Sequence, residues 1–125
     1  MTRPTNRRRA IPTNWICIAL LVVTAVSSRL PQLLGPNLLL DGDECVLGLM
    51  AKHLLEGKEF PVFFYGQTYG LSTVEAAVGA LAFSIAGPDA VPLKLAMLAL
   101  WTAGCVFCFL AFTRPYGVQR SFLIT

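Results

Sequence analysis

The sequence predicts an all-α membrane protein in which two transmembrane helices flank an external segment. Two apolar stretches, at residues 11–30 and 90–113, each come close to the roughly 20 residues that a helix needs to cross a bilayer. Apolar residues make up 55% of the chain and charged residues only 14%, whereas roughly 25% of the residues in a typical soluble domain are charged. The mean hydropathy of +0.63 agrees with this class. The net charge of +3 is too small to indicate a nucleic-acid partner.

The distribution of charge along the chain predicts its orientation. Basic residues crowd the tail at residues 1–10, and Arg114 and Arg120 follow the second apolar stretch. The seven acidic residues all lie between the two stretches: Asp41, Asp43, Glu44, Glu56, Glu59, Glu75 and Asp89. Because Lys and Arg mark the cytoplasmic side of a membrane protein, we expect both chain ends in the cytoplasm and the acidic middle outside. The expected location is the plasma (inner) membrane, as a multi-pass protein.

The first apolar stretch, residues 11–30, carries features of a spanning helix and also of a signal peptide. Trp15 lies where an interfacial aromatic residue is expected, and Arg29 can extend its side chain to the interface. The basic start, the short apolar run and Ala25-Val26-Ser27 also fit a secretory signal with a cleavage site. Retention of the N-terminus in the mature protein would reject this alternative.

The external segment, residues 31–89, is expected to contain two interfacial helices. After an irregular, proline-containing connection over 31–40, a helix from Asp43 to about Glu56 places Val46, Leu47, Met50 and Leu54 on one face. It is amphipathic and too short to span, which is typical of a helix lying along the membrane surface. The aromatic stretch 61–70 is expected to be a loop or strand-like. A second, mostly apolar helix is expected over 71–86, with Ser72 as a possible cap and Glu75 three residues on.

The second spanning helix is expected over 90–113, with Lys94 near its external end. Residues 114–125 then form a cytoplasmic turn and the opening of a third span that the chain does not complete. Within the span, Cys105-x-x-Cys108 has the spacing of a redox motif, but its apolar surroundings favour two small packing residues.

The candidate catalytic residues are in Asp41-Gly42-Asp43-Glu44, at the start of the first interfacial helix. A carboxylate at the external membrane surface can act as a general base on a hydroxyl. Acidic residues there also serve as helix caps and suit the helix dipole, which is the more common role. His53 fits a polar helix face better than a ligand set. General-base chemistry at the acidic cluster requires no metal or cofactor, so none is expected, although clustered carboxylates could bind a metal ion.

The order of these pieces resembles the N-terminal part of the polytopic GT-C-type glycosyltransferases that use lipid-phosphate sugars. The resemblance rests on DGDECVLGLMAKHLLEGKEFPVFFYGQTYG followed by STVEAAVGALAFSIAGPDAVPLKLAMLAL, after one span, and it covers about residues 10–120. This superfamily includes protein O-mannosyltransferases and aminoarabinose transferases of lipid A. Its first external loop carries an acidic pair followed by a helix that lies on the membrane.

The resemblance implies an inverting transferase that moves a sugar from a polyprenyl-phosphate donor to an acceptor hydroxyl on the external face. It implies Asp43 as the catalytic base with Glu44 beside it, and Tyr65, Gln67, Tyr69 and Glu75 as substrate-binding residues. The expected partners are the lipid-linked donor and membrane lipids. Members of the superfamily have many spans, so this chain is expected to be a fragment that is inactive alone. The alternative is a small non-enzymatic membrane protein that binds lipid or a partner subunit, with Asp43 only in a capping role.

Overall fold

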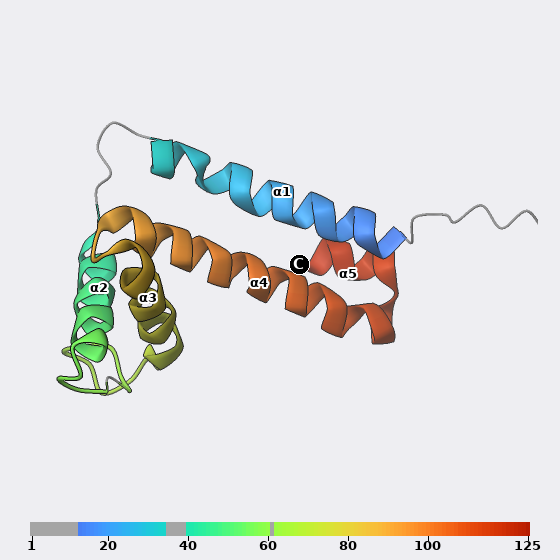
Figure 1. Cartoon of the computed structure of the whole chain (residues 1–125). Helices are drawn as coiled ribbons and strands as arrows, with labels where there is room; N and C mark the ends of the chain where they lie inside the picture. The colour runs from blue at the N-terminus through green and yellow to red at the C-terminus, as the bar shows by residue number, and fades with distance from the viewer. Residues whose placement is uncertain (1–12, 35–39, 61) are drawn as a thin grey trace, which may run out of the picture.

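The computed structural model describes residues 13–34, 40–60 and 62–125, and of Arg114 only the backbone. Within these ranges the chain forms five α-helices and no named strand, so the predicted all-α class is confirmed (Figure 1). The helices are α1 (Thr13–Leu34), α2 (Gly42–Leu55), α3 (Thr73–Ala86), α4 (Ala90–Tyr116) and α5 (Val118–Ile124). The predicted basic tail, and residues 35–39 of the predicted connection, lie outside the described residues.

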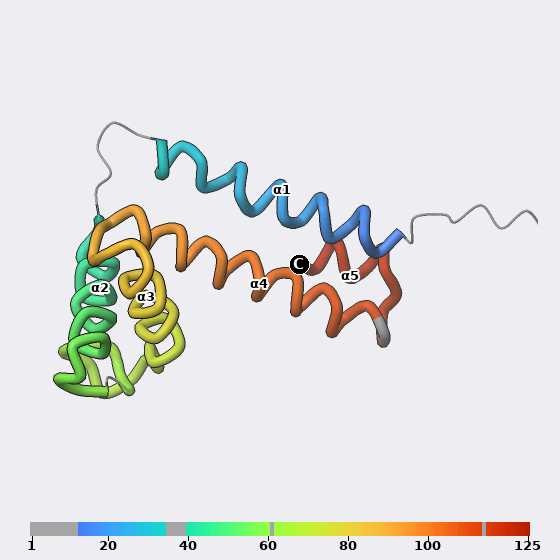
Figure 2. Tube along the Cα trace, viewed as in Figure 1, coloured from blue at the N-terminus to red at the C-terminus, as the bar shows by residue number. Residues whose placement is uncertain are grey.

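The helices form two groups that meet at one end of α4. The long helices α1 and α4 are antiparallel and lie side by side, and α5 folds back against both of them (Figure 1). α2 and α3 form an antiparallel pair that packs at the start of α4 and runs across the direction of α1 and α4 (Figure 2). If α1 and α4 cross a bilayer, this arrangement lays α2 and α3 along its surface.

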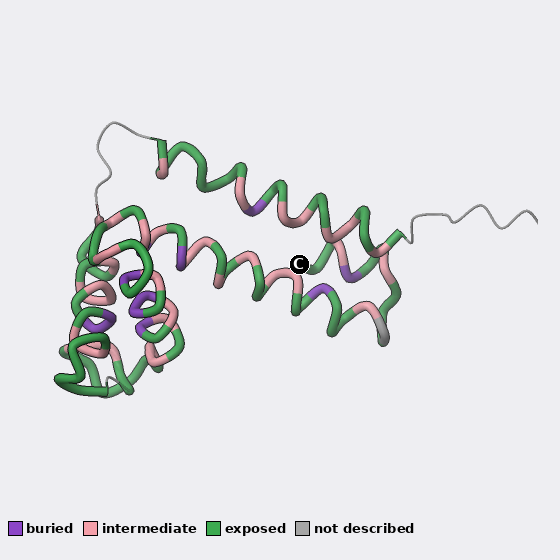
Figure 3. Tube along the Cα trace, in the orientation of Figure 1, coloured by how far each residue is buried: buried purple, intermediate pink, exposed green. Residues whose placement is uncertain are grey.

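The two long helices have the length and composition needed to cross a membrane. The candidate spans are Thr13–Leu34, with 22 residues, and Ala90–Thr113, with 24 residues, and 22 residues correspond to about 33 Å of helix. Only 6% of the apolar window of each helix is buried inside the protein. A core helix of a soluble protein would be mostly buried, whereas few residues of α1 and α4 are buried (Figure 3).

Both long helices contain a proline near their C-terminal end and extend beyond the predicted end. α1 runs through Pro31 to Leu34, so the predicted end near residue 30 was wrong by one turn. Pro31 costs α1 the backbone hydrogen bond to the Ser27 carbonyl, but only the last three residues follow it, so little of the helix depends on that bond. α4 continues through Pro115 and ends before Gly117, whose φ of +79° favours glycine. The turn predicted within residues 114–125 therefore shrinks to Gly117, and α5 begins directly after it.

Small residues let α2 and α3 pack closely against each other and against Leu93 of α4. Ala51, Ala80, Phe83 and Leu93 form a buried apolar cluster, with Leu54 packed beside it. A Cβ atom added to Gly79 would lie 3.0 Å from the Ala51 Cβ and 3.2 Å from Leu93 Cδ1. Met50, on the predicted apolar face of α2, is completely buried. These contacts fix the helix pair at the start of α4, which is the end that the charge distribution predicts to be external.

The connection between α2 and α3 is a short hairpin-like loop. Phe63 pairs with Leu71 in an isolated antiparallel bridge, and the Phe64 amide donates to the Gly70 carbonyl at 3.0 Å. Gly66 and Gly70 both have a φ of +81°, which allows the chain to reverse between them. The loop or strand-like character predicted for residues 61–70 is thus observed in the part that the structure describes.

Candidate functional site

Two of the three carboxylates at the start of α2 cap the helix. Asp41 is the N-cap residue, and its Oδ1 accepts a hydrogen bond from the Glu44 amide at 2.8 Å. Glu44 Oε2 in turn accepts from the Asp41 amide at 3.3 Å. This reciprocal pair is a capping box, which satisfies two backbone donors that α2 would otherwise leave open. The capping alternative of the sequence analysis therefore describes Asp41 and Glu44.

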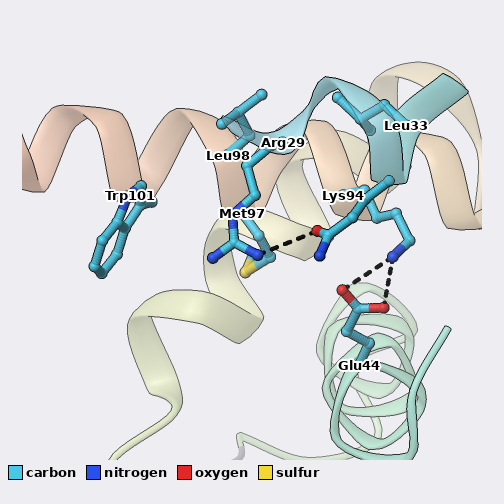
Figure 4. A pocket seen from close by; sticks show the side chains of 8 residues that line it. Arg29, Leu33, Glu44, Lys94, Met97, Leu98 and Trp101 are labelled. Atoms are coloured by element: carbon cyan, nitrogen blue, oxygen red, sulfur yellow. Dashed lines mark hydrogen bonds and ion pairs between the residues drawn. The ribbon is translucent and has the colours of Figure 1, made fainter. Parts of the chain in front are cut away.

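Glu44 also forms an ion pair with Lys94 of α4. The Lys94 ammonium lies 2.8 Å from Glu44 Oε2 and 3.1 Å from Oε1, so it donates to both carboxylate oxygens (Figure 4). The Lys94 side chain is only 11% exposed. Because a half-buried pair is less screened than a surface pair, this contact ties the first turn of α2 to α4. Glu44 is thus held by two residues, Asp41 and Lys94, which favours a positioning role over a catalytic one.

Asp43 has different surroundings from its two acidic neighbours. It is exposed, and its carboxylate makes no hydrogen bond or ion pair within the described parts of the chain. It is the second residue of α2, where the partial positive charge of the helix start stabilises an anion. Of the predicted catalytic pair, Asp43 is therefore the carboxylate that is open to a ligand.

The predicted substrate-binding loop residues lie at the opposite end of α2. The Tyr65 hydroxyl and His53 Nδ1 are 3.0 Å apart, and His53 is in the last turn of α2. Ten residues separate Asp43 from His53, which corresponds to about 15 Å along the helix. Gln67 is part of the loop turn that follows Tyr65, and Tyr69 is 70% exposed. The structure therefore does not bring Tyr65, Gln67 and Tyr69 into one cluster with the acidic residues.

Burial and a neighbouring charge raise the pKa of the Tyr65 hydroxyl. Loss of solvent and then the Glu59 carboxylate raise the pKa of Tyr65 to about 12 from its ordinary value of 10.0. Tyr65 is therefore a neutral hydrogen-bonding group at physiological pH, and its contact with His53 anchors the loop to α2.

Glu75 lies apart from both the acidic residues at the start of α2 and the loop residues at its end. It is in the first turn of α3, half-buried, and lines a largely apolar cavity of about 670 Å³ between α3, α4 and α5. Ser72 is at the N-cap position but makes no side-chain cap, so the expected capping role of Ser72 was wrong. Its hydroxyl instead approaches the Gly70 carbonyl at 3.5 Å. Within the described residues, the Glu75 carboxylate has no hydrogen-bond or ion-pair partner.

Glu44 and Lys94 belong to a cavity that the sequence analysis did not anticipate. About 230 Å³ in volume, it lies between the end of α1 and the start of α4 (Figure 4). Arg29 lines the same cavity, with Trp101 and Met97 on its apolar side. The sequence contained one indication of this cavity, because Arg29 lies near the end of one predicted span and Lys94 lies near the start of the other. Antiparallel spans bring these two ends together.

The described part of the chain shows neither a cluster of metal ligands nor a disulfide. It contains no group of three or more His, Cys, Asp or Glu side chains that could hold a metal ion. Cys105 and Cys108 are free thiols in α4.

Comparisons with known proteins do not identify a family. No family model, no curated protein and no solved structure matches the chain.

Proposed function

We propose that this chain is the N-terminal, acceptor-activating part of a membrane glycosyltransferase that uses polyprenyl-phosphate sugars. The observation that carries the proposal is the contrast within the acidic pair. Glu44 is held by the α2 cap and by Lys94, whereas Asp43 beside it is exposed and unpaired among the described residues. A rigidly placed backbone with one open carboxylate is what general-base catalysis requires.

The proposed reaction is a single displacement. The oxygen of an acceptor hydroxyl attacks the anomeric carbon of the sugar, and the bond from that carbon to the lipid phosphate breaks. Asp43 takes the hydroxyl proton, and the lipid phosphate leaves with the bonding electrons. Glu44 and Lys94 hold the first turn of α2, so that Asp43 stays at the membrane surface.

The arrangement of the helices supports a location at the boundary between water and lipid. α2 and α3 run across the direction of the two spanning-length helices (Figure 1). Large apolar side chains of α3 remain exposed, including Leu81 at 63% and Ile85 at 80%. A lipid surface would cover such side chains, while the polar start of α2 faces water.

The test is Asp43-dependent sugar transfer by the protein purified from its native membranes with any polypeptides that remain bound. Radiolabelled polyprenyl-phosphate sugars are the donors, and labelled acceptor is the readout. Asp43→Asn should lower the rate by about 10²–10⁴-fold, the usual contribution of a general base. Glu56→Gln is the matched control, because it removes an exposed carboxylate at the opposite end of α2 and should retain the parent rate.

Two results would contradict the proposal. One is transfer by Asp43→Asn at the parent rate, with the same helix content by circular dichroism. The other is no transfer from any donor by the parent preparation. The second result favours the alternative function, a non-enzymatic membrane protein that binds lipid or a partner subunit through the exposed apolar face of α3. Transfer by the 125-residue chain alone, abolished by Asp43→Asn, would overturn the expectation that it is inactive by itself.

A further inference from the structure

The cavity at the end of α1 contains a cation that no acidic side chain neutralises. Arg29 donates to Gln32 Oε1 at 3.1 Å and forms no ion pair within the described residues. Lys94, in the same cavity, is neutralised by Glu44. Two cations and one carboxylate leave a net charge of +1, so the cavity is complementary to an anion.

The same cavity adjoins an apolar groove. Leu98 lines both the cavity and a groove of about 640 Å³ that follows α4 away from it, with Val26 of α1 on one side. The groove continues past Ala103 and Phe107 to Leu110, and its lining is almost entirely apolar. A cationic chamber that opens into a long apolar groove matches a molecule with an anionic head and a hydrocarbon chain.

We propose that this site binds the phosphate of an anionic glycerophospholipid, with one acyl chain lying in the groove between α1 and α4. The planar guanidinium of Arg29 can donate two parallel hydrogen bonds to a lipid phosphate. The net charge of +1 favours a lipid with a net negative charge over zwitterionic phosphatidylcholine, because the choline ammonium of that lipid compensates its own phosphate. Trp101 and Met97 form the apolar side of the headgroup chamber. The site needs α1 and α4 to be in a bilayer but does not depend on the proposed transferase reaction.

Trp101 provides a direct reporter of occupancy. The sequence has two tryptophans, so the full chain with Trp15→Phe leaves Trp101 as the fluorophore. This protein is reconstituted into phosphatidylcholine bilayers that contain a low mole fraction of phosphatidylglycerol, with bromine on the acyl chains of one lipid at a time. Brominated phosphatidylglycerol should quench Trp101 at about fivefold lower mole fraction than brominated phosphatidylcholine, the preference that one cation near a membrane surface provides.

Variants separate a built site from general attraction to charge. Arg29→Gln should abolish the preference, and Arg29→Lys should retain part of it. Arg120→Gln is the matched control, because it removes one exposed, unpaired cation of α5 and should leave the preference unchanged. Circular dichroism verifies that each variant keeps its helix content.

Three outcomes would overturn the proposal. The first is equal quenching of the parent protein by the two brominated lipids. The second is an equal loss of preference in Arg29→Gln and Arg120→Gln, which would indicate surface charge alone. The third is displacement of the brominated lipid by inorganic phosphate or by polyprenyl phosphate at levels where phosphatidylcholine has no effect. That result would assign the site to free phosphate or to the lipid carrier.

Discussion

Three carboxylates within four residues, at positions 41, 43 and 44, have separate roles because their side chains point to different partners. Asp41 accepts the Glu44 amide, Glu44 accepts the Asp41 amide and binds Lys94, and Asp43 faces solvent. Their order along α2 determines this: only the N-cap residue and the residue three positions later can complete a capping box. Single substitutions can therefore test the proposed catalytic role of Asp43 separately from the stability of α2.

Asp41→Ala should lower the free energy of unfolding by about 1 kcal/mol, because the Glu44 amide loses its acceptor. Asp43→Ala should change it by less than about 0.5 kcal/mol, as is usual for an exposed residue without partners. Thermal unfolding in detergent micelles, followed by far-ultraviolet circular dichroism, measures both. An equal loss in the two variants would show that Asp43 also supports the helix.

Tyr65 predicts a loss of stability at alkaline pH. Its folded-state pKa of about 12, raised by burial and by Glu59, lies above the ordinary value of 10.0. The folded state therefore favours the neutral phenol, so this contribution to stability is complete below about pH 10 and is lost as the pH rises toward about 12. Tyr65→Phe should reduce the alkaline loss and remove the ionisation near pH 12 from an ultraviolet absorbance titration. Tyr69→Phe, at an exposed position, should leave that ionisation in place.

At the level of helices, the sequence predicted where α2 lies because local signals agreed. Asp41 provides a cap, Met50 and Leu54 mark the apolar face, and Gly57 follows the end. The predicted end of α1 near residue 30 was wrong, because a proline near a helix end removes a hydrogen bond without ending the helix. The Ser72 cap was wrong because the hydroxyl approaches the Gly70 carbonyl instead.

Close packing of α2 and α3 predicts opposite effects for two helix glycines. A Cβ at Gly79 already meets Ala51 at 3.0 Å, so Gly79→Leu should force the helices apart and cost roughly 1–3 kcal/mol of stability. Gly104 in α4 has open space around it, and Gly104→Ala should add roughly 0.5 kcal/mol by restricting the unfolded chain. Unfolding midpoints of the two variants test this contrast. A tolerated leucine at position 79 would mean that α2 and α3 are not in contact there.

Over the whole molecule, the sequence could list the helices but could not place the candidate site residues relative to one another. The resemblance places Asp43 and Tyr65 in one external loop. In the structure, α2 separates them, and they lie at its opposite ends. Glu44 and Lys94 are 50 residues apart in the chain and still form a bond. Such long-range contacts depend on how helices pack, which local patterns do not encode.

The two-span arrangement makes a prediction about the sides of the membrane. Cys45 is exposed near the start of α2, and Gln119 is exposed just after the turn at Gly117. The 27 residues of α4 lie between these two regions, which corresponds to about 40 Å of helix and exceeds the thickness of the hydrocarbon core. With the other three cysteines replaced by alanine, Cys45 should react with a membrane-impermeant maleimide on intact cells.

The matched variant is a cysteine-free chain with Gln119→Cys, which should react only after the cells are permeabilised. Because both side chains are exposed on the protein surface, a difference between them does not come from burial inside the protein and reports the side of the membrane. Labelling of both from one side would mean that α4 does not cross the bilayer. Labelling of Cys45 only after permeabilisation would place Asp43 in the cytoplasm, away from an external acceptor. The proposed transferase role would then fail because of the topology, even if the contacts around Asp43 are as the structure shows them.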